Sequence, residues 1–457
     1  MRTEISRRAA LKSLGATGVV LAGGATIISA QSDEASSDVD ELELVYEFEP
    51  PEGSPQEPPF GQLPENVAAS PWGAKYVSVP TQAQIWKFGS DDEPVDPPFV
   101  QFDSTEEFLV GPTGLEYDPN GRLYSAFVSD LSSSEDAETN GVYEIDDDGE
   151  YELYAEISSG VEDFPSFPND ITLLEHSLLV TDSFSGVIWE VKKGRTEVWA
   201  GELWDGDPDD FPSGPLVPPA PTAGGPQFGP NGLQFTENKD TLYVANSGKG
   251  TIVEIPVDSF GNPGEPEVFV DGLVAPDGLA MDVDENLYVA DNGANQILRI
   301  SPDGDVEVLA ENEMEGGAET TTTSANETTT TTNATTTANE TTTTEVETTT
   351  ANETTTEEET TTTTNATTTE GETTTAANET TTTANETTTA DGETTTEPAS
   401  QESPPILDQP ADVTFGAADG QRETVFVVNL ALTSQFEEPT PSLIKFDVGI
   451  EGLRVER

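Results

Sequence analysis

The sequence predicts an all-β fold, a six-bladed β-propeller built from four-stranded antiparallel blades. One short pattern recurs six times along the chain: Pro, any residue, a small or polar residue, an aliphatic residue, any residue and an apolar residue. Each copy opens a stretch with further strand-like segments, and most copies are spaced at about the length of one blade. The copies begin at Pro64, Pro112, Pro168, Pro230, Pro276 and Pro410.

The fifth repeat illustrates the expected blade. Its opening pattern, residues 276–281, is followed by a turn and by the alternating segment Leu-Tyr-Val-Ala-Asp at residues 287–291. Two more apolar-rich segments, residues 296–300 and 306–310, complete the unit. Short alternating segments separated by turn residues are typical of antiparallel strands. Each repeat is therefore expected to form one blade.

A low-complexity insertion interrupts the repeats after the fifth blade. The first five openings lie 48, 56, 62 and 46 residues apart, whereas the last interval is 134 residues. Residues 313–402 consist almost entirely of Thr, Glu, Asn and Ala, and without these 90 residues the last interval is 44. So little apolar surface cannot offset the entropy of ordering, about 1–2 kcal/mol per residue. We therefore predict a disordered Thr-rich insertion between blades five and six.

The first thirty residues predict a twin-arginine signal peptide. Arg7 and Arg8 precede an apolar run, and Ile28-Ser29-Ala30 offers a small-residue cleavage site. Retention of the run as a membrane anchor is the alternative. We expect a secreted or cell-surface protein, exported by the twin-arginine pathway, with no stable membrane insertion after cleavage. The predicted segments are the signal peptide (1–30), an acidic linker (31–40), blades one to five (41–312), the insertion (313–402) and the sixth blade with ring closure (403–457).

The composition limits the classes of partner and chemistry. Asp and Glu total 88 against 17 Lys and Arg, which gives a formal net charge of -71. This charge repels nucleic acid, and acids spread through strand-rich segments are typical of proteins adapted to high salt. The chain has no Cys, which excludes disulfides, thiolate metal sites and a Cys nucleophile. Its single His, His176, lies in a predicted turn, so nothing supports a His-dependent triad.

The residue after each opening Pro is expected to face the central channel, because the innermost strand of each blade lines it. This register holds two carboxylates and two amide carbonyls, which are hard oxygen ligands that suit Ca²⁺ or another divalent cation. The alternative is that Asn and Asp merely begin strands and turns here. Around the ring the residues are Glu65, Thr113, Asn169, Asn231, Asp277 and Ala411.

Three opening motifs resemble the SMP-30/gluconolactonase family: Pro168-Asn169-Asp170, Pro230-Asn231-Gly232-Leu233 and Pro276-Asp277-Gly278-Leu279. The resemblance covers residues 60–310 and 405–450. It implies a six-bladed propeller whose central ion, commonly calcium, is held by Glu65, Asn231 and Asp277. It further implies that Asn169 contacts substrate, and we assign Thr113, in the same ring, to substrate binding as well. Asp277 would act as both ligand and base in the hydrolysis of a lactone or small ester.

Two departures from the family pattern leave the substrate open. Phe167 stands where some lactonases have an Arg, and the first-blade Glu-Gly-Pro pattern is Glu65-Asn66-Val67 in this chain. The alternative is a non-catalytic propeller of the NHL-like kind that binds a ligand, a cell-surface glycan or a protein. Motifs such as Pro-Asp-Gly-Leu recur in many six-bladed propellers, which keeps this alternative open.

Three further features carry predictions. Trp189 and Trp199 lie on strand patterns and are expected to pack between blades. The acidic loop at residues 201–228 is either a lid over the channel mouth or a solvated surface loop. The insertion carries seven Asn-x-Thr sequons, which predict glycosylation of an exported protein, although any Asn-Thr repeat generates such sequons. They lie at Asn326, Asn333, Asn339, Asn352, Asn365, Asn378 and Asn385.

Overall fold

The computed structural model describes residues 42–50, 61–95, 97–103, 110–129, 139–159, 165–204, 211–221, 227–311, 407–432 and 439–453. The predicted signal peptide, linker, Thr-rich insertion and all seven sequons lie outside these residues. Within them, no helix is long and apolar enough to cross a membrane.

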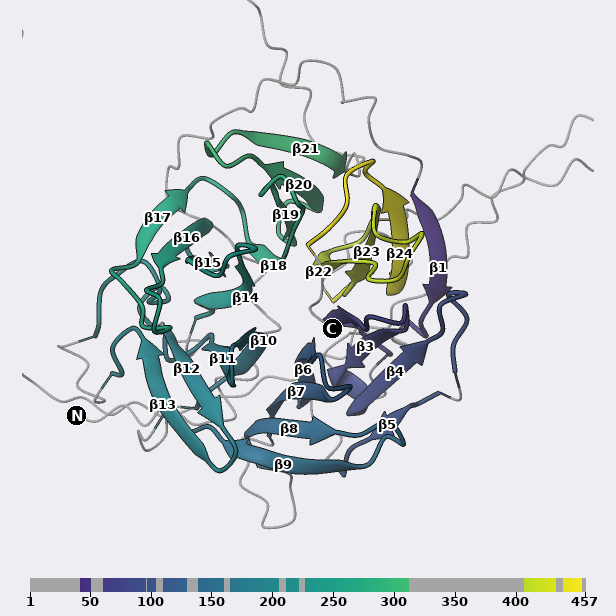
Figure 1. Cartoon of the computed structure of the whole chain (residues 1–457), viewed down its shortest axis with the longest axis horizontal. Coiled ribbons are helices and arrows are strands. Elements are labelled where there is room, and N and C mark those ends of the chain that lie inside the picture. Colours follow the sequence, from purple (N-terminus) through teal and green to yellow (C-terminus); the bar gives the residue numbers. More distant parts are fainter. Residues whose placement is uncertain are drawn as a thin grey trace, which may run out of the picture. The chain divides into compact units, whose positions relative to one another are not determined.

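Six four-stranded antiparallel sheets follow one another around a ring, which confirms the predicted propeller (Figure 1). Five blades each consist of four consecutive strands. The innermost strand of every blade contacts the innermost strands of both neighbouring blades, and the last contacts the first, which closes the ring. All six opening motifs lie on or directly before these innermost strands, as predicted.

The strands are numbered along the chain. Blades one to three consist of β2 (Val67–Ala69), β3 (Lys75–Val79), β4 (Gln84–Phe88) and β5 (Val100–Gln101); β6 (Gly111–Tyr117), β7 (Leu123–Val128), β8 (Gly141–Ile145) and β9 (Tyr151–Glu156); and β10 (Pro168–Leu174), β11 (Ser177–Asp182), β12 (Val187–Lys192) and β13 (Arg195–Ala200). Blades four to six consist of β14 (Pro230–Phe235), β15 (Thr241–Asn246), β16 (Thr251–Pro256) and β17 (Glu267–Val270); β18 (Pro276–Met281), β19 (Leu287–Asp291), β20 (Gln296–Ile300) and β21 (Val306–Glu311); and β22 (Pro410–Phe415), β23 (Thr424–Asn429), β24 (Ser442–Asp447) and β1 (Glu43–Glu47). One 3-10 turn, η1 (Pro80–Gln82), joins β3 to β4.

Blade six combines strands from both ends of the chain. β1 pairs antiparallel with β24 and is the outer strand of the sheet that also contains β22 and β23. Figure 1 shows β1, in purple, beside the yellow β24. The repeat pattern groups residues 41–312 with blades one to five, whereas the structure places residues 43–47 in blade six. The physical reason is that the described residues from Pro410 onward form three strands, β22, β23 and β24, so β1 from the other end of the described chain completes the sheet.

Apolar side chains from adjacent blades pack against one another and hold the innermost strands in place. Leu179 of blade three and Val244 of blade four, for example, belong to the same buried cluster. Trp189 is 5% exposed and packs in the cluster between blades two and three, as predicted. Trp199 packs against the cluster of blades three and four, and its Nε1 donates to the Gly261 carbonyl at 2.8 Å. Burial of each such large side chain contributes about 1.5–3 kcal/mol.

The innermost strands are irregular at their first residues. In blades two to six, the pairing register with the second strand shifts just after the opening Pro, as between Pro230 and Leu233. A β-bulge of this kind leaves the intervening residues outside the ladder. Those residues are free to interact with the neighbouring blade and with the channel, and they build the site described next.

Candidate functional site

The residues that follow the opening Pro form what we call the first ring. The structure places them at equivalent positions on neighbouring innermost strands, at the end where each strand begins. Asn169 and Asn231 are 2% and 7% exposed, whereas Glu65 and Asp277 are partly exposed. The first ring consists of Glu65, Thr113, Asn169, Asn231, Asp277 and Ala411.

Two oxygen atoms of the first ring are buried without a hydrogen-bond partner in the described part of the protein. They are Glu65 Oε2 and Asn169 Oδ1. Leaving a buried polar group unsatisfied costs about 1–3 kcal/mol. Both atoms are acceptors, and a bound cation would satisfy them.

The amide nitrogens of the two Asn side chains are occupied. Asn169 Nδ2 donates to Ser183 Oγ at 3.0 Å, and Asn231 Nδ2 donates to Ser247 Oγ at 3.0 Å. Thr113 Oγ1 donates to the Pro168 carbonyl at 2.9 Å, so its hydroxyl proton is not available to a ligand. The first ring therefore offers acceptor oxygens to whatever binds there.

Carboxylates crowd around the first ring and raise one another's pKa values. Burial raises the pKa of Glu65 well above its usual range, and the charges of Asp277 and Asp170 raise it further. Burial also raises the pKa of Asp277, with added contributions from Asp412, Asp170 and Asp291. A bound cation would relieve this repulsion and return both carboxyl groups to the charged form.

The donor atoms of the first ring fit a hard divalent cation. Ca²⁺ takes about six to eight oxygen ligands, including carboxylates, amide carbonyls and water. For such a cation Glu65 and Asp277 would supply the negative charge, and Asn231 and Asn169 would supply neutral oxygens. Among the described residues, no three His, Cys, Asp or Glu side chains could hold a metal ion by themselves. A cation held by the first ring would also have the amide oxygens as ligands.

The next residue of each repeat belongs to a second ring, which the sequence pattern describes only as small or polar. Its polar side chains accept hydrogen bonds from main-chain N–H groups of the next blade. Val67 N donates to Asp412 Oδ2 at 2.9 Å, and Leu233 N donates to Asp170 Oδ2 at 3.1 Å. Asn66 Nδ2 also donates to Asp170 Oδ1 at 3.1 Å. The second ring consists of Asn66, Gly114, Asp170, Gly232, Gly278 and Asp412.

The glycines of the second ring allow adjacent blades to approach closely. A Cβ atom on Gly278 would lie 1.8 Å from Asp412 Oδ1 and 2.5 Å from Asp412 Cα. A Cβ atom on Gly114 would lie 2.4 Å from the Asn169 carbonyl oxygen. No other residue fits at such distances. The second ring is therefore a tightly packed, hydrogen-bonded layer directly behind the first ring.

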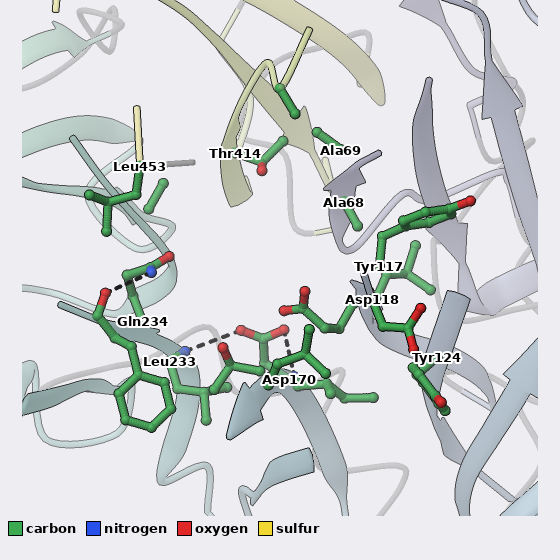
Figure 2. Close-up of a pocket in the computed structure, with 18 of the residues that line it drawn as sticks. Ala68, Ala69, Tyr117, Asp118, Tyr124, Asp170, Leu233, Gln234, Thr414 and Leu453 are labelled. Carbon is green, nitrogen blue, oxygen red and sulfur yellow. Dashed lines mark hydrogen bonds between the residues drawn. The ribbon is translucent and has the colours of Figure 1, made fainter. Parts of the chain in front are cut away.

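A separate cavity of about 1200 Å³ opens beyond the second ring, toward the other end of the innermost strands. Asp170 and Asp412 line it, together with later strand residues such as Glu116 and Gln234, but no residue of the first ring does. Figure 2 shows Gln234 and Asp170 at this cavity, with Asp170 accepting the hydrogen bond from Leu233. His176 also lines it, away from the first ring.

The carboxyl group of Glu116, which lines this cavity, should make the stability of the protein depend on pH. Burial and the charge of Asp170 raise its pKa to about 8, against a lowering contribution from Lys239. The folded protein thus retains a proton that the unfolded chain releases above about pH 4.5, so the wild type loses stability as pH rises from about 4.5 to 8. This shift corresponds to at most about 5 kcal/mol, and partial exposure of Glu116 to solvent reduces the effect. We therefore expect Glu116→Gln to be more stable than the wild type by about 2 kcal/mol at pH 8.5 and to match it near pH 4.

Urea unfolding at both pH values in high salt measures this difference. The control is Glu267→Gln, because Glu267 is exposed and should leave the pH dependence unchanged. A Glu116→Gln stability difference that stays constant between pH 4 and pH 8.5 would contradict the buried, protonated state of Glu116.

Phe167, at the position of the Arg in some lactonases, lies in an aromatic cluster. Its ring centroid is 4.9 Å from that of Phe184 and 5.2 Å from that of Phe228. Part of the loop at residues 201–228 also packs on the propeller, since Asn246 Nδ2 donates to the Pro215 carbonyl at 2.8 Å. Phe167, directly before β10, therefore contributes an apolar side chain to a buried cluster.

Four positions of the site were not predicted from the sequence: Asp170, Asp412, Ser183 and Ser247. The two serines have a detectable signal, because each follows the polar residue that ends the second strand, as Asp182-Ser183 and Asn246-Ser247. The two aspartates share the third position of the repeat pattern.

Comparisons with known proteins agree with this architecture. Solved structures similar to this chain include a luciferin-regenerating enzyme, with a TM-score of 0.50 and 11% identity over 91% of this chain and 99% of that chain. A calcium-binding protein, regucalcin, from Agrobacterium tumefaciens has a TM-score of 0.48 and 14% identity over 91% and 96%. A gluconolactonase from Xanthomonas campestris has a TM-score of 0.47 and 12% identity over 90% of each chain. No curated protein sequence matches significantly.

The family model described as the SMP-30/Gluconolactonase/LRE-like region matches residues 192–325. This segment contains blades four and five and therefore includes Asn231 and Asp277 of the first ring. Residues 192–325 are thus similar to this family, which confirms the resemblance predicted from the opening motifs at Pro230 and Pro276.

Proposed function

We propose that the protein is a divalent-cation-dependent hydrolase of a lactone or small ester, with calcium as the expected cation. The observation that carries this proposal is the pair of buried, unpartnered oxygens, Glu65 Oε2 and Asn169 Oδ1, in a ring that also contains the Asp277 carboxylate. The family match over residues 192–325 supports it.

The first ring has the groups that ester hydrolysis requires. Glu65, Asn231 and Asp277 would hold the cation, which when bound polarises the ester carbonyl. The Asp277 carboxylate accepts a proton from the water that attacks the carbonyl carbon. The new carbon–oxygen bond forms, the ester carbon–oxygen bond breaks, and the proton passes to the departing alkoxide to give a hydroxy acid. Asn169 Oδ1 would face the cation as well as the substrate. Thr113 would also contact the substrate, with Oγ1 acting as an acceptor toward a substrate hydroxyl.

The aromatic cluster around Phe167, two residues before Asn169 in the chain, bears on the substrate class. Phe167 cannot donate the hydrogen bonds that an Arg would give to a polyhydroxylated substrate. Its packing against Phe184 and Phe228 supports an apolar or lightly hydroxylated lactone over a sugar-acid lactone.

A lactone panel tests the proposal. The mature chain in molar salt is assayed with calcium against γ- and δ-lactones of graded polarity and aryl esters, with proton release as the readout. We expect turnover of at least one apolar lactone, its loss on chelation and its return with added calcium. Calcium binding without turnover of any substrate would contradict the hydrolase and favour the ligand-binding propeller.

A further inference from the structure

We propose that Ser183 and Ser247 are positioning residues that turn the amides of Asn169 and Asn231 so that both carbonyl oxygens face the cation site. This inference rests on the proposed binding of a cation by the first ring. It assigns a role to two residues that do not themselves contribute to the ligand set.

The same arrangement occurs in two consecutive blades. Ser183 Oγ accepts from Asn169 Nδ2 at 3.0 Å and donates to the Pro230 carbonyl at 2.7 Å. Ser247 Oγ accepts from Asn231 Nδ2 at 3.0 Å and donates to the Pro276 carbonyl at 2.7 Å. In each case the serine connects an Asn of its own blade to the opening Pro of the next blade.

The chemistry of the hydroxyl group dictates which way each amide points. A serine hydroxyl has one proton, and here that proton is donated to a Pro carbonyl, so Oγ can only accept from the amide. The amide must therefore present its NH₂ group to the serine. A flipped amide would place Oδ1 against the lone pairs of Oγ. The buried Asn169 Oδ1 without a partner is the result of this constraint.

These serines also connect consecutive members of the first ring. Pro230 directly precedes Asn231, and Pro276 directly precedes Asp277. Thr113 Oγ1 makes the equivalent bond to Pro168, which precedes Asn169. Hydroxyl groups thus link the first-ring positions of blades two, three, four and five. Each serine orients one ring residue and restrains the main chain of the next, which organises the oxygens before a cation arrives.

A matched pair of substitutions separates orientation from packing. Ser247→Thr retains a hydroxyl group, whereas Ser247→Val has the same shape without one. We expect Ser247→Val to weaken calcium binding 10- to 100-fold, the usual effect of losing a partner behind a metal ligand. Ser247→Thr should remain within about threefold of the wild type. Isothermal titration with calcium measures both, and the Ser183→Thr and Ser183→Val pair repeats the test independently.

Terbium luminescence supplies a readout that a loss of stability alone would not change. If the Asn231 amide rotates, a water molecule should take the place of its oxygen, so Ser247→Val should show one more inner-sphere water in paired H₂O and D₂O lifetimes. The control is Ser125→Ala, because Ser125 is buried on β7 and bonds the Ala126 carbonyl at 2.8 Å. This control should lose stability and keep the wild-type affinity and water count.

The outcomes separate this inference from the proposed function. Equal affinities for the Thr and Val variants at both positions would overturn it, as would a wild-type protein that binds neither calcium nor terbium. Hydroxyl-dependent calcium binding without lactone turnover would leave the positioning role intact and contradict only the hydrolase.

Discussion

Replacing Asp277 with Asn is expected to reduce lactone hydrolysis by about 10³-fold or more at saturating calcium. The amide retains one oxygen for the cation, so binding should be weakened rather than lost. It cannot accept a proton from the attacking water, so the chemical step fails. The substitution therefore separates the two functions that we assign to this carboxylate.

Turnover is measured at a calcium concentration set from each variant's own binding isotherm. Asp303→Asn is the matched control, because Asp303 is an exposed residue between strands β20 and β21 of the same blade. The control should match the wild type in affinity and rate. Wild-type turnover by a calcium-saturated Asp277→Asn protein would remove Asp277 from the catalytic step.

The largest expected effect on stability comes from Gly278→Ala. An added Cβ would lie 1.8 Å from Asp412 Oδ1 and 2.5 Å from Asp412 Cα, and the main chain of blade six cannot withdraw without opening the second ring. Overpacking of this severity should cost about 3 kcal/mol or more. Because Gly278 follows Asp277, calcium affinity should fall with stability.

Gly272→Ala is the control for this substitution. A Cβ at Gly272 meets nothing within 4 Å, and its φ of +84° should cost only about 1–2 kcal/mol of backbone strain. Urea unfolding in high salt compares the two variants. If Gly278→Ala loses no more stability than Gly272→Ala, then the second ring is less tightly packed than described here.

The architecture was predictable because each blade carries its own copy of the opening pattern. The same register that counts six blades also places Glu65, Asn231 and Asp277 at equivalent positions, at or just before the start of three innermost strands. The sixth blade could be recognised despite the long last interval, because the copy of the opening pattern that begins at Pro410 is complete.

The remaining features depend on contacts between blades, which no single repeat encodes. Asp170 is important because a bulge frees the N–H of Leu233 in the next blade. Ser183 is important because it lies within reach of Pro230, also in the next blade. Residues 43–47 could be assigned to blade six only once their antiparallel pairing with β24 was known. The cavity is separate from the first ring because the closely packed second ring lies between them. A pattern of apolar residues in the sequence does not reveal such packing.

The mixed origin of blade six has a consequence for biosynthesis. Glu65 lies in blade one and Asp277 in blade five, and blade six stands between them in the closed ring. β1 pairs with β24, a strand about 400 residues later in the chain, so closing the ring requires a contact between segments that are far apart in sequence. On the proposed function, a nascent chain would therefore assemble the first ring fully only after β24 has been synthesised, and calcium would bind fully only after that step.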